Sequence, residues 1–154
     1  MLIFKALHIL SMFGMVMIEI GLETLYAYTI SRPDVKALAT IHRAGKQLRA
    51  GPIAIGFLVS GIVFGLLTAL TGGFDLLDGW LIAAYVLVIG FLVTSTLFLR
   101  PALRFGQAAV DAEAAGSSTD GLAREMSASR ILVWYAVDIL IVVALIVDMV
   151  LKPF

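Results

Sequence analysis

Four long apolar stretches alternate with shorter polar segments along the chain. They cover residues 2–30, 52–70, 79–99 and 131–151. A helix of about 20 apolar residues is long enough to cross a hydrocarbon core of about 30 Å. We therefore predict an all-α polytopic membrane protein, in which four transmembrane helices form one up-and-down bundle over the whole chain.

The first apolar stretch also carries polar and sulfur-containing side chains at regular intervals. These are His8, Met12, Met15, Glu19 and Glu23. Steps of three or four residues place them on one side of a helix. An ionisable side chain at membrane depth is costly unless it faces protein or a water-filled cavity. We therefore expect this stripe to face the other three helices.

Polar residues of all four helices fall at a similar depth. We take Lys5 as the outer boundary of the first helix and Arg130 as the inner boundary of the fourth. At a rise of about 1.5 Å per residue and a core of about 30 Å, Glu19 then lies about 10 Å and Asp138 about 12 Å from the inner surface. The predicted intramembrane polar cluster consists of Glu19, Glu23, Ser60, Ser95 and Asp138. Such a cluster is either a proton or cation relay or a polar clamp that holds the helices together.

A second group of candidate ligands lies toward the other face of the bilayer. The predicted cofactor-binding residues are His8, Met12 and Met15, and the predicted metal ligands are His8, Met12, Asp148 and Met149. Imidazole and thioether groups are soft ligands that suit Cu(I), and His8 could also be an axial ligand of b-type haem. Alternatively, His8 is a core residue bonded to Asp148 or to a carbonyl, with methionines as filler.

Composition narrows the function classes further. The chain is 61% hydrophobic and only 14% charged, with a mean hydropathy of +1.04. Its formal net charge is zero, which gives no sign of nucleic-acid binding. There is no cysteine, which excludes disulfides, thiolate metal sites and cysteine nucleophiles. No hydrolase or nucleotide-binding motif is visible, so no enzyme class is indicated.

The basic residues are concentrated in two of the connecting segments. They are Arg32, Lys36, Arg43, Lys46 and Arg49 in the first, and Arg100, Arg104, Arg124 and Arg130 in the third. Only Lys5 and Lys152 fall elsewhere. The positive-inside rule then predicts that both termini are extracytoplasmic and that the two basic segments face the cytoplasm.

The connecting segments carry several local signals. We expect residues 32–49 to be an ordinary positive loop with His42 in solvent, although an extension of the second helix or a lipid-contacting surface helix also fits. Gly61 and Gly65 predict close helix packing within the chain, with dimerisation as the alternative. The third helix is expected to end at Arg100–Pro101, residues 101–115 to be helical, and Asp120 to cap a following helix.

Three short motifs give the chain a family resemblance. They are residues 5–10 (Lys-Ala-Leu-His-Ile-Leu), Gly79–Trp80, and residues 149–153 (Met-Val-Leu-Lys-Pro). The chain resembles an uncharacterised family of predicted four-helix bacterial integral membrane proteins, which implies a bacterial inner (cytoplasmic) membrane. More distantly, the Lys-x-x-His opening is similar to copper-resistance protein D and to the membrane protoporphyrinogen oxidases, in which the first-helix histidine is associated with haem. Unlike those oxidases, the chain has Met15 in place of a tryptophan and no lysine in residues 79–99.

Three functions are compatible with these features. The leading hypothesis is an accessory or redox-related membrane protein that binds b-type haem or copper near His8. The second is a proton-coupled small-solute transporter or channel that uses Glu19 and Asp138. The third is a structural subunit of a larger membrane complex. The expected partners are the lipid bilayer and either a second copy of the chain or other subunits.

Overall fold

The computed structural model describes residues 1–151, and these residues form six α-helices without a β-strand. Four helices are long and apolar enough to cross a membrane, as the sequence predicted: α1 (Leu2–Ser31), α3 (Ala50–Gly72), α4 (Gly79–Ala115) and α6 (Ile131–Leu151). Two shorter helices are α2 (Val35–Gln47) and α5 (Asp120–Ala128). Lys152 and Pro153, which contribute to the predicted orientation and to one motif, lie outside the described residues.

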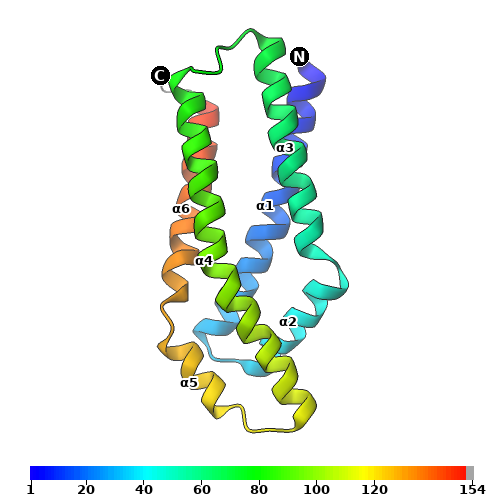
Figure 1. Cartoon of the computed structure of the whole chain (residues 1–154), viewed down its shortest axis with the longest axis vertical. Helices are drawn as coiled ribbons and strands as arrows, with labels where there is room; N and C mark the ends of the chain where they lie inside the picture. Colours follow the sequence, from blue (N-terminus) through cyan, green and yellow to red (C-terminus); the bar gives the residue numbers. More distant parts are fainter. Residues whose placement is uncertain (152–154) are drawn as a thin grey trace.

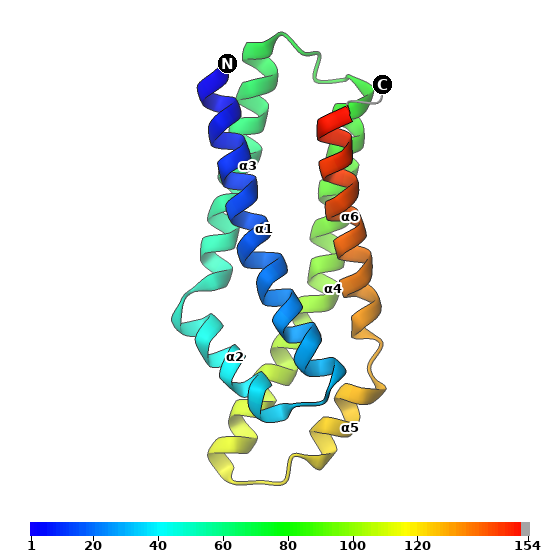
Figure 2. The same cartoon turned by 180° about the vertical axis from the view of Figure 1, so that it is seen from behind.

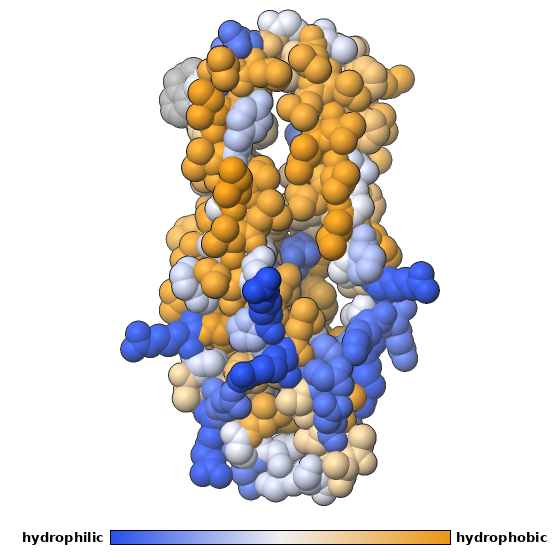
Figure 3. Space-filling view, viewed as in Figure 1, coloured by the Kyte–Doolittle hydropathy of each residue, from blue (hydrophilic) through white to orange (hydrophobic). Residues whose placement is uncertain are grey.

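The long helices associate as two pairs, α1 with α3 and α4 with α6 (Figure 1). The pairs approach each other at the end that holds α2 and α5 and stand apart at the end that holds Met1 and Leu151 (Figure 2). Figure 3 shows apolar side chains over the second end, with an opening between the pairs, and hydrophilic side chains around the first. We call the end with α2 and α5 the basic end, because it carries Lys36, Arg43 and Arg124.

Two glycines hold α1 and α3 close together. A Cβ atom on Gly61 would lie 2.4 Å from the Met12 sulfur, and one on Gly65 would lie 2.9 Å from His8 Nδ1. The absent side chains are therefore what allows Met12 and His8 to pack against the α3 backbone. The predicted packing role of these glycines within the chain is confirmed.

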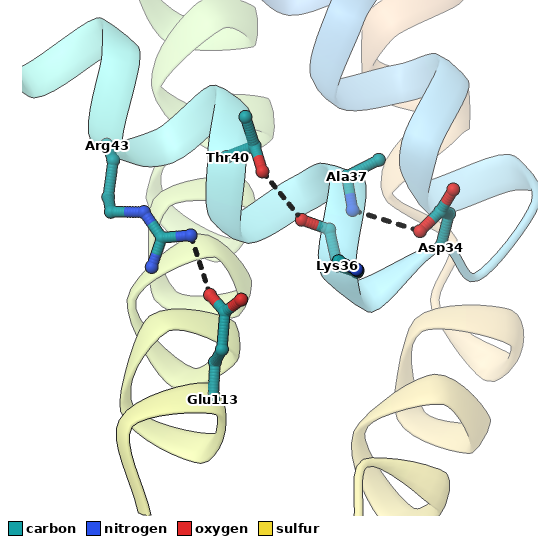
Figure 4. A network of polar contacts seen from close by, with 6 residues as sticks. All are labelled: Asp34, Lys36, Ala37, Thr40, Arg43 and Glu113. Carbon is teal, nitrogen blue, oxygen red and sulfur yellow. Dashed lines mark hydrogen bonds and ion pairs between the residues drawn. The ribbon is translucent and has the colours of Figure 1, made fainter. Parts of the chain in front are cut away.

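Helix α2 corrects the expectation of an ordinary loop over residues 32–49. The Asp34 side chain accepts a hydrogen bond from the Ala37 amide at 2.9 Å and so caps the helix (Figure 4). Leu38 and Ala39 are fully buried, so the apolar side of α2 packs on protein rather than on lipid. Arg49 adopts a left-handed conformation (φ 52°) that separates α2 from α3, so α2 is not an extension of the second span.

Helix α4 is longer than predicted. It continues through Pro101 to Ala115 instead of ending at Arg100–Pro101. Beyond the proline, Ala102, Phe105 and Ala109 are buried in the same core as α2 and the end of α1. This burial offsets the hydrogen bond that the proline removes. The cap prediction for Asp120 is also wrong, because Thr119 is the N-cap residue and Asp120 is the first residue of α5.

Candidate functional site

Asp138 is buried inside the protein and is held by two neighbouring hydroxyl groups of α4. It has no exposed surface. The Thr94 hydroxyl donates to one carboxyl oxygen, and the Ser95 hydroxyl donates to the other at 2.9 Å. Because Thr94 and Ser95 are consecutive on α4, their hydroxyls reach the two oxygens from adjacent positions. Both oxygens of Asp138 therefore have a donor at a depth where water is scarce.

A second carboxyl group packs against this one. Glu23 of α1 has no exposed surface, and its nearest polar neighbours are Asp138 and Ser95. Neither of its carboxyl oxygens makes a hydrogen bond of ordinary geometry. Glu19, one helical turn earlier, lies within electrostatic range of both carboxyl groups. We call Glu19, Glu23 and Asp138 the carboxyl cluster.

No lysine, arginine or histidine within residues 1–151 is paired with the carboxyl cluster. Within residues 1–151 the side-chain ion pairs are Arg43–Glu113 at 2.6 Å and Arg104–Glu125. The first joins α2 to the extension of α4 and the second joins that extension to α5, so both lie at the basic end. Three acids without a basic partner, surrounded by apolar helices, are costly to maintain. Packing alone does not require such an arrangement.

Glu19 stands in the wall between two cavities, and Leu99 of α4 is the other residue that lines both. The first cavity extends toward α2 and is lined by Tyr26, His42 and Lys46, among others. The second follows α3 and α4 toward the middle of the apolar region, and its wall includes Ser95. Glu19 can therefore contact the contents of either cavity.

The structure brings together most of the predicted polar cluster. Glu19, Glu23, Ser95 and Asp138 meet where α1, α4 and α6 come together. Ser60 is half-buried on α3, and no hydrogen bond between its hydroxyl and the other cluster residues is present in residues 1–151. Thr94 was not in the predicted cluster, although the run of hydroxyl residues 94–96 was the signal that could have indicated it.

The His8 group occupies the opposite end of α1. The Nδ1 atom of His8 donates to the Gly61 carbonyl at 2.7 Å, because a carbonyl oxygen can only accept. In a neutral ring, this hydrogen on Nδ1 leaves Nε2 as the nitrogen with a lone pair. Met12 packs on Gly61, whereas Met15 is buried against Phe91 and lines the second cavity.

The other two predicted metal ligands lie on a different helix pair. Asp148 is buried on α6 and its Oδ2 atom makes no hydrogen bond, while Met149 is 36% exposed. Helix α6 packs along α4, and α1 and α6 stand apart at this end of the molecule (Figure 2). In residues 1–151, no three side chains among His, Asp and Glu gather in a way that could hold a metal ion.

His42 corrects a prediction, because it is buried with 4% of its surface exposed rather than solvated. Its Nδ1 atom lies 2.8 Å from the Tyr26 hydroxyl oxygen. Burial lowers the pKa of His42 from its usual 6.5, and a hydrogen bond with Gln107 opposes this effect in part. The spacing of Val35, Leu38 and His42 on one side of α2 was the signal for burial, and the surrounding basic residues obscured it.

Comparisons with known proteins add no constraint: no family model, no curated protein and no solved structure matches this chain.

Proposed function

We propose that this chain is a multi-pass integral membrane protein that carries protons, and a small solute coupled to them, across the bilayer by means of the carboxyl cluster. The observation that carries the proposal is the fully buried pair Glu23–Asp138, which has hydroxyl neighbours but no ion pair with any cation in the described part of the chain. Four apolar helices long enough to span a membrane support the location.

The chemistry of the pair favours a relay over a clamp. Two carboxyl groups in contact at low dielectric cannot both be charged, so together they hold a proton. A clamp needs only Asp138 with the hydroxyls of Thr94 and Ser95, and these already satisfy it. Glu23 adds a carboxyl group whose oxygens lack ordinary hydrogen bonds, an arrangement that costs about 1–3 kcal/mol. A group kept at such a cost is typical of a proton pathway.

The proposed topology is an up-and-down bundle with its basic end in the cytoplasm and both termini outside. Its support is the concentration of lysine and arginine in the segments around α2, α5 and the extension of α4. The resemblance to a bacterial family leads us to propose the inner membrane. In this orientation, the first cavity extends from Glu19 toward the cytoplasm and the second extends into the apolar half of the protein.

Proton flux into liposomes tests this function. The purified protein is reconstituted with a pH-sensitive dye inside, and flux is driven by a potassium gradient with valinomycin. We expect Glu19→Gln and Asp138→Asn to reduce the flux at least about tenfold, because each removes a proton-carrying group. Ser127→Ala, at an exposed hydroxyl on α5, is the matched control and should leave the flux unchanged. Wild-type flux in both Glu19→Gln and Asp138→Asn would contradict the proposal.

One observation favours a second function, the binding of b-type haem or copper by His8. Its Nδ1–H bond to the Gly61 carbonyl fixes the ring and leaves Nε2 as a ligand nitrogen, as is usual for metal-bound histidine. An absorption spectrum and a copper determination on the purified protein, with His8→Ala beside it, test this function. A Soret band or bound copper that is lost in His8→Ala supports it, and the absence of both from the wild-type protein contradicts it.

A further inference from the structure

The Tyr26–His42 pair lies between the carboxyl cluster and the surface of the basic end. Tyr26 follows Glu23 by almost one turn of α1, and both Tyr26 and His42 line the first cavity together with Glu19. The Tyr26 hydroxyl oxygen and His42 Nδ1 are 2.8 Å apart. The two side chains therefore make a hydrogen-bonded bridge from α1 to α2 beside the cavity that Glu19 enters.

The ring of His42 packs directly on the backbone of Gly106 in α4. A Cβ atom on Gly106 would lie 2.4 Å from His42 Nδ1, so only glycine leaves room for the ring. The other ring nitrogen, Nε2, is buried and makes no hydrogen bond of ordinary geometry. The polar and charged groups around His42 are Tyr26 of α1, Lys46 of α2, and Gln107 and Asp111 of α4. Lys46, Gln107 and Asp111 belong to the hydrophilic surface, since Lys46 Nζ donates to Gln107 at 2.9 Å and Gln107 in turn donates to Asp111 at 2.8 Å.

We infer that Tyr26 and His42 form the link through which Glu19 exchanges its proton with the basic end of the protein. This inference rests on the proposed proton-carrying function. It assigns a role to two buried residues that the carboxyl cluster does not include. The Nδ1 atom of the imidazole faces the Tyr26 hydroxyl at the cavity, and Lys46, Gln107 and Asp111 act on the same ring from the surface.

The proton transfer balances at every atom. A hydronium ion at the basic end gives a proton to His42 Nε2 and becomes water, and the Nδ1–H bond breaks as that hydrogen moves to the Tyr26 oxygen. The original Tyr26 hydroxyl hydrogen passes through cavity water to the Glu19 carboxylate, which becomes a carboxylic acid. The imidazole is then neutral with its hydrogen on Nε2. When Glu19 gives its proton back to the basic end, the same steps run in reverse and restore the starting tautomer of His42.

The local chemistry suits both directions of transfer. A phenol hydroxyl can donate and accept, and imidazole can carry a hydrogen on either nitrogen. Burial lowers the pKa of His42, so the ring is neutral near pH 7 and has a nitrogen free to accept. Exchange by this route consequently needs no charged side chain to move into the apolar region.

Removal of the Tyr26 hydroxyl tests the Tyr26–His42 link and changes the packing of the protein very little. Tyr26→Phe removes one oxygen atom, and Tyr135→Phe is the matched control, because Tyr135 also bonds to α1 through a hydroxyl contact of 2.9 Å with Thr24. Liposome proton flux is measured for both variants, for Glu19→Gln and for the wild-type protein. We expect at least about a tenfold loss in Tyr26→Phe and in Glu19→Gln, and wild-type flux in Tyr135→Phe.

The outcomes separate the link from the function. If Glu19→Gln loses flux and Tyr26→Phe does not, the link is wrong and the proposed function stands. If Glu19→Gln keeps its flux, the proposed function fails, and infrared spectroscopy then decides the link. The carboxyl band of Glu19, assigned by its absence from Glu19→Gln, shifts in D2O as its hydrogen is exchanged for deuterium. The rate of this shift should fall at least about tenfold in Tyr26→Phe. An unchanged exchange rate would overturn the link.

Discussion

At the scale of single residues, two histidine rings of this protein occupy space that a glycine on a neighbouring helix leaves free. Gly106 leaves the space that the His42 ring fills, and Gly65 does the same for His8. Asp138 is held in the opposite way, by two added hydroxyls on adjacent residues. The two histidine positions therefore depend on glycine, whereas the position of Asp138 depends on hydrogen bonds.

Two glycines of α4 allow a matched test of this packing. Gly106→Ala would place a Cβ atom 2.4 Å from His42 Nδ1, whereas Gly90→Ala would place one 3.5 Å from Ile141 Cδ1, which is an ordinary contact. We expect Gly106→Ala to lower the free energy of unfolding by about 1–3 kcal/mol. Gly90→Ala should be neutral or stabilising, because alanine favours helix. Unfolding in detergent measures both, and equal stability of the two variants would contradict the packing described here.

His42 also gives the stability a pH dependence. Its pKa is lowered by burial in the folded protein, so the unfolded chain binds a proton more readily. The stabilising contribution is therefore present above the unfolded value of about 6.5 and is lost as the pH falls through the lower folded value. We expect the melting temperature to fall between pH 7.5 and pH 5, and to fall less in His42→Gln. The same pH dependence in both proteins would show that His42 is not responsible.

At the scale of helices, α2 is held to the extension of α4 mainly by apolar packing. Leu38 is fully buried. The ion pair between Arg43 and Glu113, drawn in Figure 4, has both side chains nearly half exposed. Exposed ion pairs contribute little because water screens them and the side chains lose freedom. The core of the basic end should therefore decide whether α2 stays docked.

Substitution of one packing residue and one ion-pair residue tests whether apolar packing contributes more than the ion pair. Leu38→Ala should cost about 2–5 kcal/mol, because it leaves a cavity in a fully buried position. Glu113→Gln should cost at most about 1 kcal/mol. Chemical unfolding of the detergent-solubilised protein compares the two. A larger loss in Glu113→Gln than in Leu38→Ala would mean that charge, not packing, holds α2.

The helices that the sequence predicted well are those with a long apolar run. The last span was predicted at its observed bounds, the first two differ only at their ends, and the third continues from residue 99 to Ala115. Pro101 marked a local break that the burial of Phe105 and Ala109 overrides, and no local pattern reports that burial. Within the site, helical spacing indicated Glu19 and Glu23, because a 3.6-residue period fixes a face, and depth along the last helix indicated Asp138. The Tyr26–His42 contact joins two helices and was not visible in either one.

At the scale of the whole molecule, the protein is two helix pairs that meet at the basic end. The carboxyl cluster lies where α1 of one pair meets α4 and α6 of the other. Beyond it, toward Met1 and Leu151, the pairs diverge and leave an opening (Figure 3). The cluster thus lies at the junction of the two helix pairs.

The proposed orientation can be tested with single cysteines, because the chain has none of its own. Leu77→Cys lies in the exposed turn before α4, and Ser118→Cys lies in the exposed segment before α5. A membrane-impermeant maleimide applied to intact cells should label Leu77→Cys, and it should label Ser118→Cys only after permeabilisation. The opposite pattern would invert the topology and place the first cavity on the outer side.

The most direct test of the central claim is the infrared spectrum of the reconstituted protein at pH 7. The account predicts a carboxylic-acid C=O band from the proton that Glu23 and Asp138 share, with a clear loss of intensity in both Glu23→Gln and Asp138→Asn. A wild-type spectrum without that band, or one that neither substitution changes, would contradict the claim that these buried groups carry a proton.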